Sequence, residues 1–138
     1  MPLDASAKAV LERARDEAAR LHHDHVGTEH LALALLRLPL IANRLVQELG
    51  IDTEQARAAI ESAVASGAPG AEPDGSLPFT TSTNRVCALA QQHAHALGET
   101  AVGAEHLLVG LLQEPGIGGQ VLAGHGLSAD AVLSALRH

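Results

Sequence analysis

Aromatic residues are almost absent from this chain of 138 residues, which has no Trp, no Tyr and a single Phe, Phe79. Proteins that bind single-stranded nucleic acids commonly stack the bases on several aromatic side chains. One aromatic residue does not supply such a platform. The sequence therefore argues against nucleic acid as a partner.

Positive charge is also scarce. Nine Lys and Arg residues stand against sixteen Asp and Glu, which gives a net charge of −7. Phosphate backbones and anionic lipid surfaces repel such a chain. The single lysine, Lys8, is in no Gly-Lys-Ser/Thr loop for ATP phosphates. No run of about eighteen apolar residues predicts a membrane span. We expect neither a nucleic acid nor a membrane partner.

Cysteine is limited to Cys87, which excludes an internal disulfide and a four-thiolate zinc site. A lone thiol favours a reducing compartment, and the charged first twenty residues contain no apolar signal-peptide region. These features predict a cytoplasmic protein. No nucleophile or metal-ligand motif is found, so we predict that the chain is not an enzyme and needs no cofactor or metal.

The apolar residues present are mostly Ala and Leu, with 26 and 22 copies. Both are strong helix formers, and β-branched residues are comparatively few, so the composition predicts an all-α fold. The chain also repeats itself after 76 residues: Val26-Gly27-Thr28-Glu29-His30-Leu31 recurs as Val102-Gly103-Ala104-Glu105-His106-Leu107. Fifteen of the 56 pairs between residues 7–62 and 83–138 are identical. We therefore predict one domain made of two copies of one unit.

The apolar spacing predicts four short helices in each copy. In the first copy they cover about residues 10–21, a central buried helix with Thr28 as N-cap, a helix from Ile41 closed by Gly50, and one after Asp52. In the second copy they cover about residues 82–97, 104–113, a stretch ending near 124–126, and the residues after Ser128. The first repeat spans about residues 5–65, a Pro- and Gly-rich linker residues 66–79, and the second repeat about residues 80–138.

The Gly-Thr/Ala-Glu-His segment is the polar cluster that both copies keep, and two interpretations of it are open. In the structural one, Glu29 and Glu105 complement the positive end of a helix, while His30 and His106 hydrogen-bond the backbone of the neighbouring loop. In the functional one, the free N–H groups bind an anion and the carboxylate holds a guanidinium. The second interpretation suits a ligand that carries both phosphate and guanidinium.

Two other features favour structural interpretations. The segment His22-His23-Asp24-His25 resembles a metal site, but it has no counterpart in the second copy, and we interpret it as a solvated helix end. Cys87 falls in the middle of a helix where the first copy has Leu11, so we interpret it as a small buried hydrophobic residue.

Each copy resembles the amino-terminal repeat of the Clp unfoldases, of the ClpC type. The resemblance lies in the Val-Gly-Thr/Ala-Glu-His-Leu segment, in the Ala/Leu helix before it, and in the Leu-Leu pair, the Pro and the Gly-capped helix after it. Leu77-Pro78-Phe79-Thr80 resembles the start of the second repeat in that type. The resemblance covers about residues 7–138. It implies an all-α domain of two four-helix repeats related by a pseudo-twofold axis. It also implies a module that docks adaptors and substrates for an AAA+ motor, which we expect here as a freestanding protein.

The resemblance further implies two phosphoarginine sites, one per repeat, in which Glu29 and Glu105 grip the guanidinium beside Thr28 in the first copy. Ala104 replaces that Thr in the second copy, which predicts a weaker second site. The family usually has Phe and Thr before its first helix, a segment that reads Met-Pro-Leu-Asp-Ala-Ser here, so we expect the first site to lack its aromatic contact. Phe79 and Thr80 are expected to form a surface for proteins or peptides. Cyclic peptide antibiotics that target the unfoldase are the alternative ligand, which the chain would sequester.

Overall fold

The computed structural model describes residues 2–64 and 77–137, and these form eight helices. The helices are α1 (Ala5–Arg20), α2 (Thr28–Arg37), α3 (Ile41–Glu48), α4 (Thr53–Ala63), α5 (Thr81–Ala96), α6 (Ala104–Gln113), α7 (Ile117–Gly124) and α8 (Ala129–Leu136). The all-α prediction with four helices per copy is confirmed. The predicted linker lies outside the described residues except for residues 77–79.

The helix ends follow local chemistry. Asp52 accepts hydrogen bonds from the N–H groups of Glu54 and Gln55, and Ser128 accepts one from the N–H of Ala131, so both act as N-caps. Gly50 ends α3 with a φ of 87°. The prediction that Thr28 is an N-cap is wrong: Gly27 takes that position, and the ring of His30, three residues later, accepts a hydrogen bond from the backbone N–H of Gly27.

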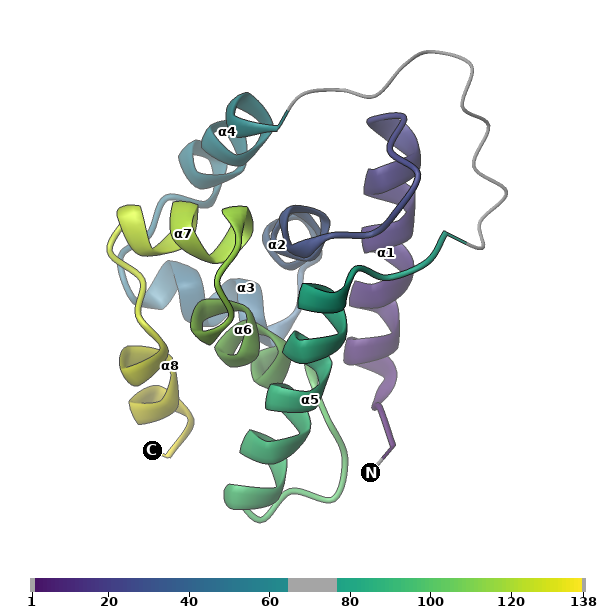
Figure 1. Cartoon of the computed structure of the whole chain (residues 1–138). Helices are drawn as coiled ribbons and strands as arrows, with labels where there is room; N and C mark the ends of the chain where they lie inside the picture. Colours follow the sequence, from purple (N-terminus) through teal and green to yellow (C-terminus); the bar gives the residue numbers. More distant parts are fainter. Residues whose placement is uncertain (1, 65–76, 138) are drawn as a thin grey trace.

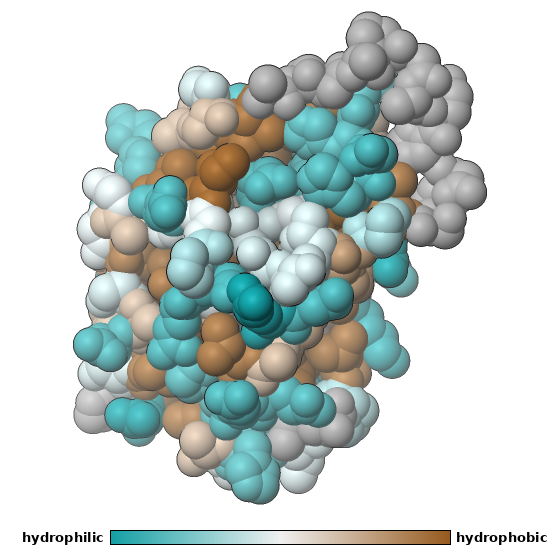
Figure 2. Space-filling model, in the orientation of Figure 1, coloured by the Kyte–Doolittle hydropathy of each residue, from teal (hydrophilic) through white to brown (hydrophobic). Residues whose placement is uncertain are grey.

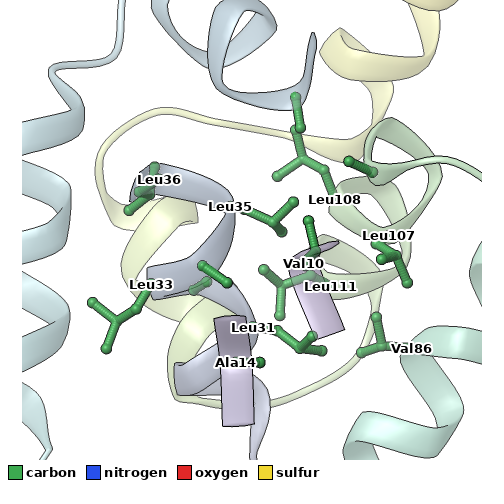
Figure 3. Packing of buried hydrophobic residues seen from close by; sticks show 14 of the residues in the cluster. Val10, Ala14, Leu31, Leu33, Leu35, Leu36, Val86, Leu107, Leu108 and Leu111 are labelled. Carbon is green, nitrogen blue, oxygen red and sulfur yellow. The ribbon is translucent and has the colours of Figure 1, made fainter. Parts of the chain in front are cut away.

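Two helices form the centre of the molecule, α2 and α6 (Figure 1). Each packs against helices of its own repeat and of the other: α2 contacts α1, α3 and α4, and also α5, α6 and α7. Leu31 and Leu35 of α2 lie toward Leu108 and Leu111 of α6 in one core, which also contains Val10 of α1 and Val86 of α5 (Figure 3). The largest fully buried leucines of the two helices are Leu31, Leu33, Leu35, Leu107, Leu108 and Leu111. The two repeats therefore share one core, and the prediction of a central buried helix in the first copy is confirmed.

An ion-pair network around the buried carboxylate of Glu17 distinguishes the first repeat. Glu17 of α1 is 2% exposed, and its carboxylate lies 2.7 Å from Nε of Arg37 in α2 and 2.8 Å from Arg20. Arg20 and Arg37 each lie 2.7 Å from Glu61 of α4. In the second repeat the pair that corresponds to Glu17 and Arg37 is a single hydrogen bond of 2.7 Å between His93 and Gln113. The contact between α1 and α2 is therefore an ion pair, and the equivalent contact between α5 and α6 is a hydrogen bond that involves no carboxylate.

The surface mixes polar and apolar residues on the face shown in Figure 2. Among the described residues the exposed large hydrophobic side chains are Ile41, Leu49 and Ile117. None of the helices in the described part of the chain has both the length and the apolar character needed to cross a membrane.

Candidate functional site

Each copy of the Gly-Thr/Ala-Glu-His segment is the first turn of a central helix, and we name residues 27–30 and 103–106 the first and second Glu-His turns. In the first, the backbone N–H of Gly27 donates to Nδ1 of His30 at 2.8 Å. In the second, the N–H of Gly103 donates to Nδ1 of His106, also at 2.8 Å. Both rings are buried. The structural interpretation of the two histidines is confirmed: each fixes the loop that enters its helix.

The hydrogen bond to Gly27 determines where the proton of His30 lies. Because Nδ1 accepts the amide hydrogen, the neutral ring carries its proton on Nε2 and donates it to Nδ1 of His23, 2.7 Å away. Burial, with the nearby His23 and His25, lowers the pKa of His30 to about 4. The ring is therefore neutral at physiological pH. His23 is half-buried, so this part of the predicted solvated helix end is bound to the turn.

The same hydrogen bonds rule out a simple metal site. His23, Glu29 and His30 lie close enough together for one ion. A metal on Nε2 of His30 would displace the proton that this nitrogen must carry while Nδ1 accepts from Gly27. Gly27, His30 and His23 therefore form a hydrogen-bonded chain and, with Glu29, do not make a ligand set.

The carboxylates of Glu29 and Glu105 are mostly covered but have no cationic partner. Their side chains are 14% and 16% exposed, and each carboxylate folds back over the preceding glycine. Nδ1 of the adjacent histidine lies 3.4 Å from the carboxylate in both turns. That nitrogen accepts a backbone hydrogen and does not donate to the carboxylate. Within residues 2–64 and 77–137, neither carboxylate is paired with a Lys or Arg side chain.

The wall beside each Glu-His turn comes from the other repeat. Phe79 pairs with Val26 in a short parallel bridge, through hydrogen bonds from Val26 N–H to Pro78 O (2.8 Å) and from Thr80 N–H to Val26 O (3.0 Å). Residues 78–80, which we name the linker segment, therefore lie beside the first Glu-His turn.

Residues 2–4, which we name the N-terminal segment, are the counterpart of the linker segment and lie beside the second Glu-His turn. Leu3 pairs with Val102, through hydrogen bonds from Asp4 N–H to Val102 O (2.8 Å) and from Val102 N–H to Pro2 O (2.9 Å). The expectation that the missing N-terminal Phe deprives the first site of its aromatic contact is therefore wrong, because this segment lies beside the second Glu-His turn. The first Glu-His turn keeps its aromatic neighbour, Phe79, and the second has Leu3. Comparing the two copies shows which residues occupy equivalent positions. It does not show which residues of one repeat pair with the other repeat in space.

The first turn has further neighbours that the sequence did not single out. The guanidinium carbon of Arg15 lies 4.5 Å from the centre of the Phe79 ring, a cation–π contact that adds positive charge beside the linker segment. Thr28 is 4% exposed, and a Cβ on Gly116 would come within 2.5 Å of its hydroxyl oxygen. Its side chain is thus packed against the start of α7. Its role in ligand binding stays a prediction, together with those of Glu29, Glu105, Phe79 and Thr80.

Comparison with known proteins decides the family. Residues 3–125 match the Clp repeat (R) N-terminal domain. The chain belongs to the Clp repeat N-terminal domain family. It is 36% identical over 126 residues to the negative regulator of genetic competence ClpC/MecB of Bacillus subtilis, covering 90% of this chain and 15% of that protein. It is 37% identical over 123 residues to the chloroplastic chaperone protein ClpC of Pisum sativum, covering 88% and 13%. The Clp repeat domain thus spans about a seventh of the length of these curated relatives.

Solved Clp N-terminal domains have the same fold. The N-terminal domain of the caseinolytic protease associated chaperone ClpD from Arabidopsis thaliana superposes with a TM-score of 0.74 at 28% identity, covering 99% of this chain and 95% of that one. The N-domain of ClpV from Vibrio cholerae has a TM-score of 0.80 at 18% identity, covering 97% and 82%. The resemblance predicted from the repeated motifs is confirmed.

Proposed function

We propose that this Clp repeat domain is a non-enzymatic binding module that holds client proteins or adaptors of a Clp protease chaperone, and so modulates or mimics the unfoldase. The observation that carries the proposal is the pair of Glu29 and Glu105. Two mostly covered carboxylates, without a cationic partner in the described chain, occupy equivalent helix starts. Such groups favour a ligand that brings its own cation.

The ligand group that fits this chemistry is phosphorylated arginine. Its guanidinium would pair with the glutamate, and its phosphate would take the positive helix end and, at the first turn, the field of Arg15. Phe79 and Thr80 would supply the adjoining surface for the rest of the client. Cys87 is half-buried and not fully buried as expected, and its partial burial raises the pKa of its thiol. A single free thiol is typical of a reducing compartment, and we place the function in the cytoplasm.

Calorimetric titration with free phosphoarginine tests this function. The wild type is expected to bind, and the double substitution Glu29→Gln with Glu105→Gln is expected to abolish binding because it removes both carboxylate charges. Glu54→Gln is the matched control, since Glu54 also lies in the first turn of a helix but is exposed and pairs with Arg57. Absence of binding, or equal binding by the double variant, would contradict the phosphoarginine proposal.

A second candidate function is sequestration of cyclic peptide antibiotics. The observation that favours it is an open hollow of about 620 Å³ on the outer face of α5, the helix that Phe79 precedes, lined by Ala88, Gln91, Gln92 and His95. A cyclic peptide that binds the folded chain must raise its melting temperature. The control is an Ala88→Glu variant, which fills the hollow with charge and is expected to show no shift. An unchanged melting temperature of the wild type at saturating peptide would remove this candidate.

A further inference from the structure

The two Glu-His turns are equivalent in sequence position but differ in what the opposite repeat places beside them. At the first turn, Thr80 of the linker segment caps α5 by accepting from the N–H of Thr83 at 3.1 Å. At the second turn, Asp4 of the N-terminal segment caps α1 by accepting from the N–H of Ala7 at 2.9 Å. The same capping role is thus filled by a neutral hydroxyl in one place and by a carboxylate in the other.

Asp4 brings a second negative charge to the second turn. A Cβ placed on Gly103 would lie 2.9 Å from Oδ2 of Asp4 and 2.1 Å from Oε1 of Glu105, so both carboxylates lie over the same glycine. Burial raises the pKa of Asp4, but hydrogen bonds from Ser6 and Ala7 and the nearby His106 outweigh burial and hold that pKa below its usual value. Asp4 is therefore charged at neutral pH.

Ser6 occupies the backbone N–H group that would otherwise donate a hydrogen bond to a bound anion. Its hydroxyl donates to Oδ1 of Asp4 at 2.6 Å and accepts from the backbone N–H of Ala104 at 2.9 Å. That N–H opens α6, where free amide groups otherwise attract anions. At the first turn the equivalent residues are Ser82 and Thr28, and no such hydrogen bond joins them in the part of the chain that the structure describes.

The cationic side is also unequal. Arg15 lies over Phe79 beside the first turn, whereas its equivalent in the second repeat is Gln91, which has no charge. The first turn therefore combines one carboxylate with a nearby guanidinium and an open helix start. The second combines two carboxylates with a helix start that the chain's own serine occupies.

We infer that only the Glu29 turn accepts a phosphorylated guanidinium, and that Asp4 and Ser6 are the specificity-determining residues that close the Glu105 turn to phosphate. This inference rests on the proposed phosphoarginine function. A phosphate at the second turn would meet like charge from Asp4 and would have to displace Ser6 from the Ala104 N–H. This chain therefore takes one phosphorylated arginine, at the first Glu-His turn beside Phe79 and Thr80.

Titration calorimetry with phosphoarginine on the full chain tests the inference by stoichiometry. The wild type is expected to bind one equivalent. Glu29→Gln is expected to weaken binding by at least about tenfold, whereas Glu105→Gln changes it by no more than about twofold. Amide chemical shifts give a residue-level readout, in which Gly27 is expected to move on titration and Gly103 to stay.

The gain-of-function variant is Asp4→Thr with Ser6→Ala, which copies the neutral cap of α5 and frees the Ala104 N–H. It is expected to bind a second equivalent and to keep one when combined with Glu29→Gln; circular dichroism melts check that the variant is folded. Two equal sites in the wild type, loss of binding through Glu105→Gln, or one site in the folded gain-of-function variant would overturn the inference and leave the proposed function standing. No binding by any of these proteins would overturn both.

Discussion

The loop that leaves α1 places His22 in the left-handed region, with a φ of 59°. The equivalent residue in the second repeat is Gly98, with a φ of 76°. A residue that carries a Cβ is strained in this region, by roughly 1–2 kcal/mol. His22 is exposed, so its replacement removes strain without removing packing.

We therefore expect His22→Gly to stabilise the protein by about 1 kcal/mol, measured as the free energy of unfolding in urea. The matched reverse change, Gly98→His, is expected to destabilise by a similar amount, because a Cβ at Gly98 meets open space and only the backbone is strained. A neutral or destabilising effect of His22→Gly would show that the side chain of His22 contributes contacts that outweigh its strain.

The buried ring of His30 predicts a pH dependence of stability. Its pKa in the folded chain is about 4, below the ordinary value of 6.5, because burial and the neighbouring His23 and His25 disfavour the charged form. Unfolding therefore takes up a proton between these two pH values. The contribution of His30 is fully present above pH 6.5 and is lost as the pH falls toward 4, by about 2 kcal/mol between pH 7 and 5.

His30→Asn is the variant that tests this contribution, because the amide oxygen can still accept from Gly27 but does not titrate. We expect urea unfolding of the variant to show a smaller loss of stability between pH 7 and 5 than the wild type. All other titrating groups are common to both proteins. An identical loss in both would mean that His30 is not the group responsible.

At the scale of the helices, the backbones of α5 and α6 approach each other closely where the two helices cross. A Cβ on Gly110 of α6 would lie 2.6 Å from the carbonyl oxygen of Val86 in α5. The first repeat has Ala34 at the equivalent position, so the second helix pair packs closer than its copy. Gly in a helix costs about 1 kcal/mol of helix propensity, and the close crossing of α5 and α6 compensates.

Gly110→Ala is therefore expected to destabilise the protein by about 1–3 kcal/mol, because the clash outweighs the gain in propensity. Gly124→Ala is the control: Gly124 is also helical, but a Cβ there would meet nothing within 4 Å, and we expect it to stabilise by up to about 1 kcal/mol. Thermal melts of the two variants measure both effects. Stabilisation by Gly110→Ala would show that α5 and α6 separate without penalty.

At the scale of the whole molecule, the repeats are interlocked. Phe79 is bridged to Val26, which precedes the first Glu-His turn, and Leu3 is bridged to Val102, which precedes the second. In addition, α2 packs on three helices of the second repeat. Neither repeat encloses its own central helix. Short helices without such packing are marginal in water. One cooperative folding unit follows, although the sequence is two copies.

We expect fragments 1–64 and 77–138 to be weakly helical when separate, with no cooperative melt. Mixed at equal concentration, they are expected to recover most of the helical signal at 222 nm and a single transition, because the shared core forms only when both are present. The intact chain is the control. A cooperative melt of either fragment alone would show that a repeat is an independent folding unit.

The sequence by itself determined the fold class, the helix positions and the family. Ala and Leu at helical spacing predict helices from local information, and the 76-residue repeat shows that the second half folds as the first does. One of the two interpretations that the sequence left open, that His30 and His106 hydrogen-bond the backbone, is correct, since a helix start leaves N–H groups that nearby side chains satisfy. The one wrong cap, Thr28, depends on a ring whose orientation only packing decides.

The tertiary structure alone decided what stands beside each Glu-His turn. A repeat comparison aligns Glu29 with Glu105 but does not show that Phe79 serves the former and Leu3 and Asp4 the latter, because those pairings join residues far apart in the chain. Local sequence sets helices through short-range backbone bonds and apolar spacing. The charge around each glutamate is set by long-range contacts between the repeats, and these distinguish two sites that the sequence presents as copies.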